Sequence, residues 1–401
     1  MSGAGSAGSP GGEIRLKLFG RTDVGQIREH NEDNFLIADL SRQSRSLMEA
    51  DRDQLVGSSG TVFAVCDGMG GAAAGEVASK LAVDIIYEKM LAGGKPDNRD
   101  GLARRLVSTV EEAGLRIFNE ARADRTRRGM GTTSTVAALL DARLFIAQVG
   151  DSRAYLLRGE QFTQVTRDQS LVNQLIEAGQ LTEEEAETFE HNNIILQALG
   201  TAETVQVDLT YVDLRRGDVL LMCSDGLSGM IRGDDMRSVL LSMSEPLEAC
   251  KLLTEKANQA GGHDNITVIV VRFEGEGLHA VQPEDEPVKY RKYALPQSHD
   301  PTVRPGGLSS RPAEASPPSE EAERESRNLR VGHTMVGMQS PLTSLRPSAR
   351  PSHAPTQRSA SGRPGEEPVD LPTTGLPPSL VGFIVVTTLL LVVAMGFWLL
   401  R

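Results

Sequence analysis

Four apolar runs in this chain end or begin at an aspartate with small neighbours, and this pattern constrains the fold more than any other feature. They are TVFAVCDG at 61–68, LFIAQVGDS at 144–152, DVLLMCSDG at 218–226 and HDNITVIVV at 263–271, the last with its acid first. Runs of this kind are typical of buried strands, so the acids are expected at the rim of a sheet. Converging carboxylates repel one another unless cations lie between them, and hard divalent cations prefer oxygen ligands. The pattern therefore predicts a sheet-based fold with a carboxylate-lined site for several metal ions.

Composition divides the 401 residues into a single folded body and its flanking segments. Apolar strand and helix patterns fill residues 14–274, which is one well-packed domain by size. Residues 1–13 are a Gly/Ser/Ala tail that we expect to be flexible. Residues 275–379 are rich in Pro, Ser and Arg without apolar periodicity and are predicted to be a disordered linker. Residues 380–400 are predicted to form a transmembrane helix.

The order of the expected elements favours an α+β fold. Helical spacing at 76–91 and 102–123 places two helices in succession between strands, and 143–161 has the pattern of a β-hairpin. Both features argue against a strictly alternating βαβ arrangement. We expect a four-layer α-β-β-α sandwich, in which two antiparallel sheets are stacked face to face and flanked by helix pairs.

The C-terminal apolar segment indicates a membrane anchor. Residues 380–400 contain no charged side chain, and about 21 helical residues span about 31 Å, one bilayer core. The N-terminal segment lacks the apolar core of a signal peptide. LPTTG at 371–375 resembles a cell-wall sorting signal, but such processing requires export, so coincidence is preferred. We expect a single-pass, tail-anchored protein of the cell membrane, with its folded body in the cytoplasm.

Charge and cysteine content exclude several classes of function. The net charge of −12 argues against nucleic acid as a partner held by a basic field, and aromatic residues make up only 4% of the chain, which disfavours a nuclease. The three cysteines, Cys66, Cys223 and Cys250, lack CxxC spacing. They are expected to be small buried side chains in a reducing compartment, not disulfides or zinc ligands.

The acids at the strand ends are the candidate metal ligands. GMGG follows Asp67, and glycines there let the backbone approach an ion, so that the Asp67 carboxylate can bridge two metals and the Gly68 carbonyl can add a ligand. Asp225 repeats the Asp-Gly pattern, and Asp264 and Asp151 complete the set. Each has a turn or cap explanation alone, but the four together predict a shared metal site.

A further cluster, REHNEDN at 28–34, precedes these acids. Arg28 offers a planar fork that matches two phosphate oxygens. Glu32 and Asp33 are adjacent in a strand-like stretch and are expected to point to opposite faces, so that only one reaches the ions directly.

Together these motifs resemble the PP2C-type, or PPM, protein phosphatases, and in particular the bacterial serine/threonine members. R-x-x-x-E-D, the apolar run into DGMGG, GTT at 131–133, GDSR, SDGL and GGHDN follow in the family's order. The resemblance covers residues 15–273, almost the whole predicted body. It implies a β-sandwich flanked by helix pairs and a binuclear Mn²⁺ or Mg²⁺ centre.

The resemblance also implies a role for each candidate residue. Asp67 would bridge both ions and Gly68 would bind one of them, while Asp225 and Asp264 would hold the other. The remaining assignments are Glu32 acting through bound water, Asp33 as a supporting acid, Arg28 as the phosphate-binding arginine, and Asp151 with Asp225 as a third, weaker metal position. The stretch 166–199 would be a mobile flap beside the site.

The chain departs from the family pattern at a few positions. Met69 follows the Asp-Gly pair, where animal members carry a proposed general acid, and Ala72 stands where many bacterial members have histidine. The proton donor to the leaving oxygen therefore remains open, with His30 and His263 near in sequence and a metal-bound water as the alternative. Gly229 replaces an acid of the third position. The flap begins with Asp-Gln-Ser where Asp-His-Ser is common.

The predicted function is metal-dependent hydrolysis of phosphoserine and phosphothreonine in proteins. The attacking group would be a water activated by two metal ions, without a phosphorylated enzyme. Expected partners are phosphorylated proteins, including membrane serine/threonine kinases, and the membrane itself. The alternative is a catalytically weak phosphatase-like domain that binds phosphoproteins as a regulatory module.

Overall fold

The computed structural model describes residues 12–45, 52–70, 74–186, 189 and 193–296. The chain divides into two compact units, 1–305 and 306–401, and all described residues belong to the first. The predicted linker beyond residue 296 and the predicted transmembrane helix at 380–400 lie outside the described residues. Within the described part, no helix is long and apolar enough to cross a membrane.

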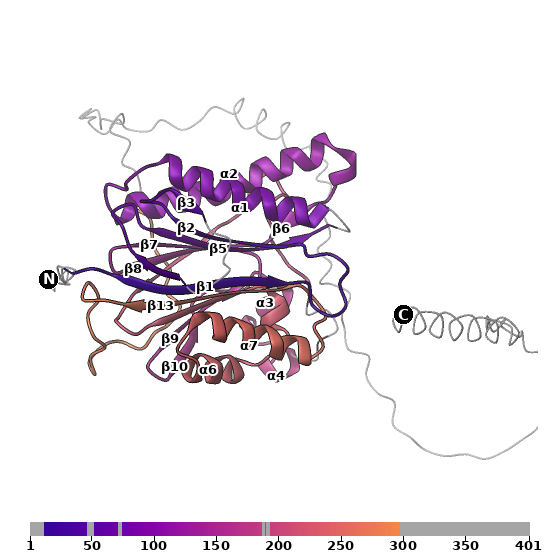
Figure 1. The fold of residues 1–401 in the computed structure, drawn as a ribbon. Helices are drawn as coiled ribbons and strands as arrows, with labels where there is room; N and C mark the ends of the chain where they lie inside the picture. Colours follow the sequence, from indigo (N-terminus) through magenta and orange to yellow (C-terminus); the bar gives the residue numbers. More distant parts are fainter. Residues whose placement is uncertain (1–11, 46–51, 71–73, 187–188, 190–192, 297–401) are drawn as a thin grey trace, which may run out of the picture. The chain divides into compact units, whose positions relative to one another are not determined.

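Two antiparallel sheets form the centre of the first unit (Figure 1). The first sheet contains, in spatial order, β10 (Gln161–Gln164), β9 (Arg153–Arg158), β12 (Val219–Cys223), β13 (Ile266–Glu274), β1 (Arg15–Asp23) and β4 (Arg52–Leu55). The second contains β11 (Asp208–Asp213), β8 (Arg143–Val149), β7 (Ser134–Leu140), β5 (Thr61–Met69), β2 (Asp33–Asp39) and β3 (Ser44–Arg45), with β6 (Gly131–Thr132) paired to β5. The predicted α+β class with two antiparallel sheets is confirmed.

Helices cover the outer faces of both sheets, as Figure 1 shows. α1 (Ala74–Ala92) and α2 (Arg99–Ala123) lie over the second sheet, and α6 (Gly233–Ser242) and α7 (Pro246–Gln259) lie over the first. The shorter helices are η1 (Arg125–Arg127), α3 (Leu171–Glu177), α4 (Glu183–Ala186) and α5 (Asp225–Ser228). α2 begins at an Asn98 cap, whose side chain accepts from the Gly101 amide at 2.8 Å.

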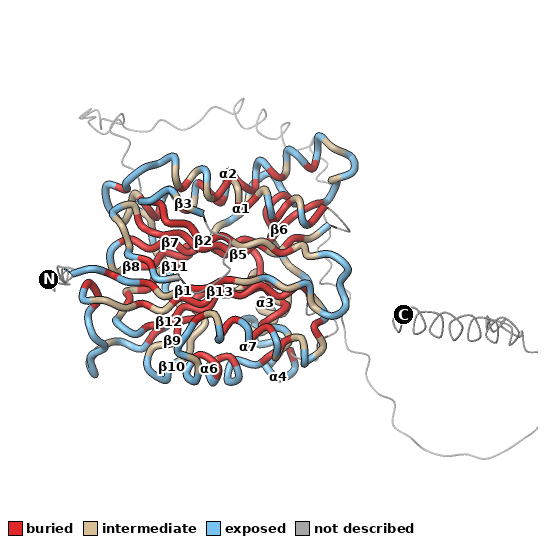
Figure 2. Tube along the Cα trace, viewed as in Figure 1, coloured by how far each residue is buried: buried red, intermediate tan, exposed pale blue. Residues whose placement is uncertain are grey.

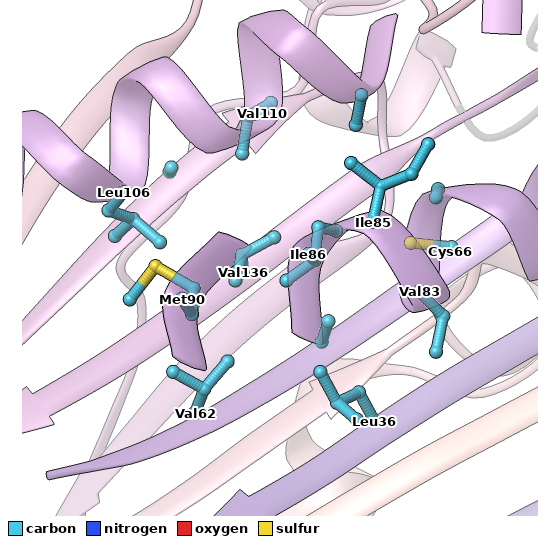
Figure 3. Packing of buried hydrophobic residues seen from close by; sticks show 14 of the residues in the cluster. Leu36, Val62, Cys66, Val83, Ile85, Ile86, Met90, Leu106, Val110 and Val136 are labelled. Carbon is cyan, nitrogen blue, oxygen red and sulfur yellow. The ribbon is translucent and has the colours of Figure 1, made fainter. Parts of the chain in front are cut away.

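The alternation of side chains along β5 explains why its apolar run is uninterrupted. Val62, Ala64 and Cys66 face the cluster beneath α1 and α2, which Figure 3 shows, while Phe63 and Val65 face the cluster between the sheets. Successive side chains of a strand point to opposite faces, so a strand covered on both sides is apolar throughout. Figure 2 shows the buried strands in the two middle layers, with exposed residues on the outer faces of the helices.

All three cysteines are buried and free, as predicted. Burial raises the pKa of the Cys66 and Cys223 thiols to about 12, so both remain protonated at neutral pH. Cys66 packs beneath the α1–α2 layer and Cys223 beneath the α6–α7 layer.

The folded body continues past the boundary predicted at residue 274. Residues 276–296, which we name the C-terminal strap, pack onto the sheets and bury Leu278 and Val288. The backbone of the strap pairs with β11, because Tyr293 donates to the Leu209 carbonyl at 2.8 Å. The composition of residues 275–379 predicted disorder for the whole segment. The few apolar residues that anchor the strap did not change this prediction, because most residues of the segment are polar.

Candidate active site

The candidate residues come from segments that meet where strands of the two sheets end. Asp33 lies directly opposite Asp67 in the antiparallel pairing of β2 with β5. In the other sheet, Arg153 of β9 pairs with Cys223 of β12, and Asp151 and Asp225 each lie two residues beyond that pair. The full candidate set is Arg28 and Glu32 in the loop 24–32, Asp33 at the start of β2, Asp67 and Gly68 in β5, Asp151 before β9, Asp225 at the start of α5, and Asp264 before β13.

The backbone of Asp67 is held by two neighbouring threonines. Its amide donates to Thr133 Oγ1 at 2.9 Å, and its carbonyl accepts from the Thr133 amide at 2.8 Å and from Thr132 Oγ1 at 2.9 Å. Thr133 is itself fully buried and shares a 2.8 Å hydrogen bond with Ser152. The GTT motif therefore fixes the strand position from which the Asp67 carboxylate projects.

Asp33 is buried, and only one of its carboxylate oxygens has hydrogen-bond partners. Oδ2 accepts from Ser224 Oγ and Thr267 Oγ1, each at 2.7 Å. Burial raises the pKa of Asp33 to about 8, although these two hydrogen bonds oppose the shift. Because Thr267 lies in β13 of the first sheet and Ser224 directly follows β12 of that sheet, Asp33 joins the two sheets at the site.

Asp67, Asp151 and Asp225 form a group of mutually repelling carboxyls. Burial raises the pKa of Asp67 well above its usual range, and repulsion by Asp33, Asp225 and Asp151 adds to this. Burial also raises the pKa of Asp151 to about 7, with repulsion from Asp225 as the next cause. The pKa of Asp225 is raised by burial and then by Asp264. These acids are therefore close in space, with Asp151 buried and Asp67 and Asp225 half-buried.

Glu32 approaches the group from the loop 24–32. A Cβ atom on Gly75, in the first turn of α1, would lie 2.8 Å from Glu32 Oε1, so only glycine leaves room for this carboxyl. Burial raises the pKa of Glu32, and Arg28 opposes that shift. His30 also lowers the pKa of Glu32, so it lies near this carboxyl. The His263 ring packs against its own turn instead, because a Cβ atom on Gly261 would lie 2.7 Å from His263 Nε2.

Unpartnered oxygens test whether these residues suit a metal ion. Nine side-chain nitrogen or oxygen atoms are buried without a hydrogen-bond partner in the described part of the chain, and four of them are carboxylate oxygens. All four belong to the candidate set: Glu32 Oε1, Asp33 Oδ1, Asp151 Oδ1 and Asp225 Oδ1. Buried carboxylate oxygens without donors are strongly destabilising unless a cation binds them. The donor set therefore fits hard divalent cations.

The side chains as they stand do not yet enclose an ion. Among the described residues, no three His, Cys, Asp or Glu side chains are arranged to hold one. Two contacts oppose such an arrangement. Arg28 donates to Asp264 Oδ2 at 2.7 Å, and the Asp67 and Asp225 carboxyls lie close enough for each to shift the pKa of the other. Both contacts involve carboxylates that the cations would require as ligands. The metal site expected from the sequence therefore requires Arg28 to leave Asp264 and the Asp67 and Asp225 carboxyls to move apart.

Arg28 remains accessible despite its ion pair. Its side chain is 49% exposed and that of Asp264 is 34% exposed. The Arg28 guanidinium is therefore open to solvent beside the candidate acids, where an incoming phosphate can compete with Asp264 for it.

The predicted flap stretch is attached beside the site at both ends. At its start, Gln169 accepts from the Gly150 amide and donates back to the Gly150 carbonyl, both at 2.9 Å. At its end, the backbones of Leu199 and Thr132 exchange hydrogen bonds of 2.8 and 3.1 Å. One attachment is therefore next to Asp151 and the other is one residue from Thr133.

Sequence reasoning missed the residues that position the acids. Thr133, Ser224, Thr267 and Asn265 carry no chemistry of their own and lie within apolar strands or turns. For Thr133, Ser224 and Asn265 the only sequence signal was a place in GTT, SDGL or GGHDN, which does not say what these residues contact. Thr267 lies outside these motifs. Gly229, where an acid was expected for the third metal position, donates its amide to the Asp225 carbonyl at 2.6 Å.

Comparison with known proteins places the same region in one family. The family model for protein phosphatase 2C matches residues 41–259. The serine/threonine phosphatase stp of Listeria innocua is 36% identical over 251 residues, which cover 63% of this chain and 93% of that protein.

Solved structures agree with this match. The Mycobacterium tuberculosis serine/threonine phosphatase PstP/Ppp is similar with a TM-score of 0.55 and 33% identity, covering 65% of this chain and 99% of that chain. The catalytic domain of the serine/threonine protein phosphatase PstP in complex with two manganese ions is similar with a TM-score of 0.54 and 32% identity, over 65% and 99% of the two chains.

Proposed function

The chain belongs to the protein phosphatase 2C family and is a protein serine/threonine phosphatase, and from this premise we propose how its site works. Its substrates are phosphoproteins. In our proposal, two divalent cations would share the Asp67 carboxylate, the Gly68 carbonyl would bind one of them, and Asp225 and Asp264 would bind the other. Glu32 acts through bound water, Asp33 supports the group, and Asp151 with Asp225 forms a weaker third position. Mn²⁺ and Mg²⁺ are the candidate ions, since a similar catalytic domain holds manganese.

One observation supports this proposal above the others. The four unpartnered buried carboxylate oxygens all fall within the proposed ligand set, and the pKa values of their carboxyls are all raised. Such a group is unfavourable by itself and becomes favourable once positive charge is bound. When bound, divalent cations lower the pKa of water and polarise the phosphate, so hydrolysis needs no phosphorylated side chain.

The residues of the chain contribute positioning and charge. In our proposal, Arg28 leaves Asp264 and binds two phosphate oxygens through its planar fork, which spreads the charge of the transition state. The threonines behind Asp67 keep its carboxylate in place, and the hydroxyls of Ser224 and Thr267 orient Asp33. The buried cysteines take no part, because all three lie in the apolar layers and burial raises the pKa of the Cys66 and Cys223 thiols to about 12.

The proposal predicts that Asp67→Asn abolishes activity while the domain stays folded. Loss of a bridging ligand should lower phosphopeptide turnover by about a hundredfold or more. The fold should survive because the substitution relieves repulsion among buried acids. The measurement is phosphate release from a phosphothreonine peptide with Mn²⁺ or with chelator, beside circular dichroism of the same sample.

Asp39→Asn is the matched control for this variant. Asp39 is a buried aspartate, 2% exposed, at the opposite end of β2 from Asp33, whereas Asp67 is half-buried. It should retain turnover, and chelator should silence it as it silences the wild type. Near-wild-type turnover in Asp67→Asn would show that the bridging assignment is wrong.

We also propose that the phosphatase is held at the cytoplasmic face of the cell membrane through residues 380–400. The support is the uncharged apolar stretch of the sequence, and the substrates would then include membrane-bound phosphoproteins such as kinases. Membrane fractionation with protease treatment from each side tests this. Cleavage of the body only from the cytoplasmic side is expected, whereas recovery of the body in the wall fraction would favour sorting at LPTTG.

A further inference from the structure

Asn265 makes an unusual set of contacts with the loop that carries Arg28. It is 4% exposed, and its side-chain amide makes three hydrogen bonds. Oδ1 accepts from the Glu32 amide at 2.8 Å, and Nδ2 donates to the carbonyls of Val24 and His30, both at 2.9 Å. An amide group offers one acceptor and two donors in a fixed plane, and all of them are used here.

These three contacts hold both ends of one loop. Residues 24–32 connect β1 to β2, and the partners of Asn265 lie at its first residue and near its last. Arg28 lies between these points, so the loop position decides where its guanidinium projects. The ion pair with Asp264 is largely solvent-accessible, and such pairs fix a side chain only weakly. The three hydrogen bonds to the buried Asn265 side chain are thus the firmer constraint on the loop.

The backbone of Asn265 reaches the other proposed metal ligands. Its amide donates to Asp264 Oδ1 at 2.8 Å, and a Cβ on Gly226 would lie only 2.0 Å from its carbonyl oxygen. Asn265 therefore contacts the segment that carries Arg28, the carboxylate of Asp264 and the turn of α5 that begins with Asp225.

We propose that Asn265 is a positioning residue for phosphate binding, because it sets the loop 24–32 against the start of β13. The inference rests on the proposed function of Arg28 and Glu32. Asn265 touches neither substrate nor ions, and its effect passes through the loop. Loss of the amide should thus weaken phosphate binding more than it slows the chemical step.

The test compares Asn265→Ala, Asn265→Asp and Arg28→Ala in the full chain. Inhibition by inorganic phosphate and the KM for a phosphothreonine peptide are measured with Mn²⁺. We expect both constants to rise about tenfold or more in Asn265→Ala, with a smaller change in kcat. Asn265→Asp keeps the acceptor for the Glu32 amide but turns an oxygen toward two carbonyls, so it should not rescue binding.

A double variant separates positioning from general damage. If Asn265 acts through Arg28, then Arg28→Ala combined with Asn265→Ala should bind phosphate little worse than Arg28→Ala alone. Additive losses would overturn the proposal. Gln54→Ala is the control: Gln54 is a buried amide, 3% exposed, that donates to Thr61 at the opposite end of β5 from Asp67. It should lower stability without changing the phosphate constants.

Hydrogen exchange distinguishes failure of this inference from failure of the proposed function. Amides of residues 24–32 should exchange faster in Asn265→Ala than in the wild type, whether or not the chain hydrolyses phosphopeptides. An inactive wild type with this exchange pattern would contradict the proposed function and leave the loop contact standing. An active wild type whose Asn265→Ala variant shows unchanged exchange and unchanged phosphate constants would overturn the inference.

Discussion

At Asp33, two hydroxyl groups satisfy one carboxylate oxygen and leave the other buried without a partner. One carboxylate oxygen of Glu32, of Asp151 and of Asp225 is likewise buried without a hydrogen-bond partner. A protein that kept these acids for stability alone would have given both oxygens donors, since unpaired buried charge is strongly destabilising. At the scale of the residue, the site is thus prepared for positive charge.

The raised pKa values predict how stability changes with pH after chelation. The pKa values of Asp33 and Asp151 are raised to about 8 and about 7, whereas unfolded aspartate titrates near pH 4. Between these values the folded chain binds more protons than the unfolded chain, so the free energy of unfolding falls as pH rises. The stabilising effect of Mn²⁺ should grow over the same range.

Thermal unfolding at about pH 5.5, 7 and 8.5, with chelator or with Mn²⁺, measures this effect. We expect the Tm with chelator to fall across the series and the difference made by Mn²⁺ to widen. A Tm with chelator that rises toward pH 8.5 would contradict the raised pKa values. The Asp67→Asn variant should show a weaker pH dependence, because it removes one of the repelling acids.

At the scale of the element, the sequence predicted what depends on local periodicity. The long strands and the helices α1, α2, α6 and α7 could be predicted from the spacing of their apolar residues. The candidate acids could then be predicted from their positions at the ends of the strands. The short edge strands β3, β4 and β10 were missed, because two to four residues of mixed polarity carry no period. The positioning role of Thr133 and Asn265 was missed too, since it depends on partners more than 60 residues away.

Close backbone packing at α5 gives a prediction at this scale. A Cβ on Gly226 would lie 2.0 Å from the Asn265 carbonyl, so Gly226→Ala must push α5 away from the start of β13. Because Asp225 begins this helix and Asp264 precedes that strand, we expect turnover to fall about a hundredfold. The free energy of unfolding should fall by about 1–3 kcal/mol.

Gly233→Ala provides the comparison for Gly226→Ala. Gly233 begins α6, and a Cβ there would be 4.0 Å from Phe162, an ordinary contact. This variant should keep its turnover and be as stable as the wild type or slightly more so. Phosphopeptide hydrolysis measures the turnover of both variants, and urea denaturation measures their free energies of unfolding. Equal turnover in the two would show that the approach of α5 to β13 is not needed by the site.

At the scale of the whole molecule, the C-terminal strap makes the folded body longer than the region matched by the family model. That match ends at residue 259, whereas the strap runs from 276 to 296. It is fastened by the ion pair of Arg215 with Asp285 at 2.6 Å and by backbone pairing along β11. β11 is an edge strand, and covering such an edge protects it from pairing with another chain.

The strap should therefore unfold together with the sheets. Leu278 is fully buried in the cluster between the sheets, so Leu278→Ala should lower the free energy of unfolding by about 2–5 kcal/mol. Val281, in the same strap, is 46% exposed, and Val281→Ala should change it by about 0.5 kcal/mol or less. The measurement is urea denaturation followed by circular dichroism. A main transition unaffected by Leu278→Ala would show that the strap is an independent appendage.

The most direct test of the account counts bound metal. The chelator-treated chain is dialysed to equilibrium against Mn²⁺, and the bound ions are counted for the wild type and for Asp67→Asn. We predict two tightly bound ions per wild-type chain, as in the manganese complex of the similar catalytic domain, and loss of tight binding in the variant. A wild-type chain that binds no Mn²⁺, or that binds it equally well without the Asp67 carboxylate, would contradict the claim that these buried acids exist to hold metal ions.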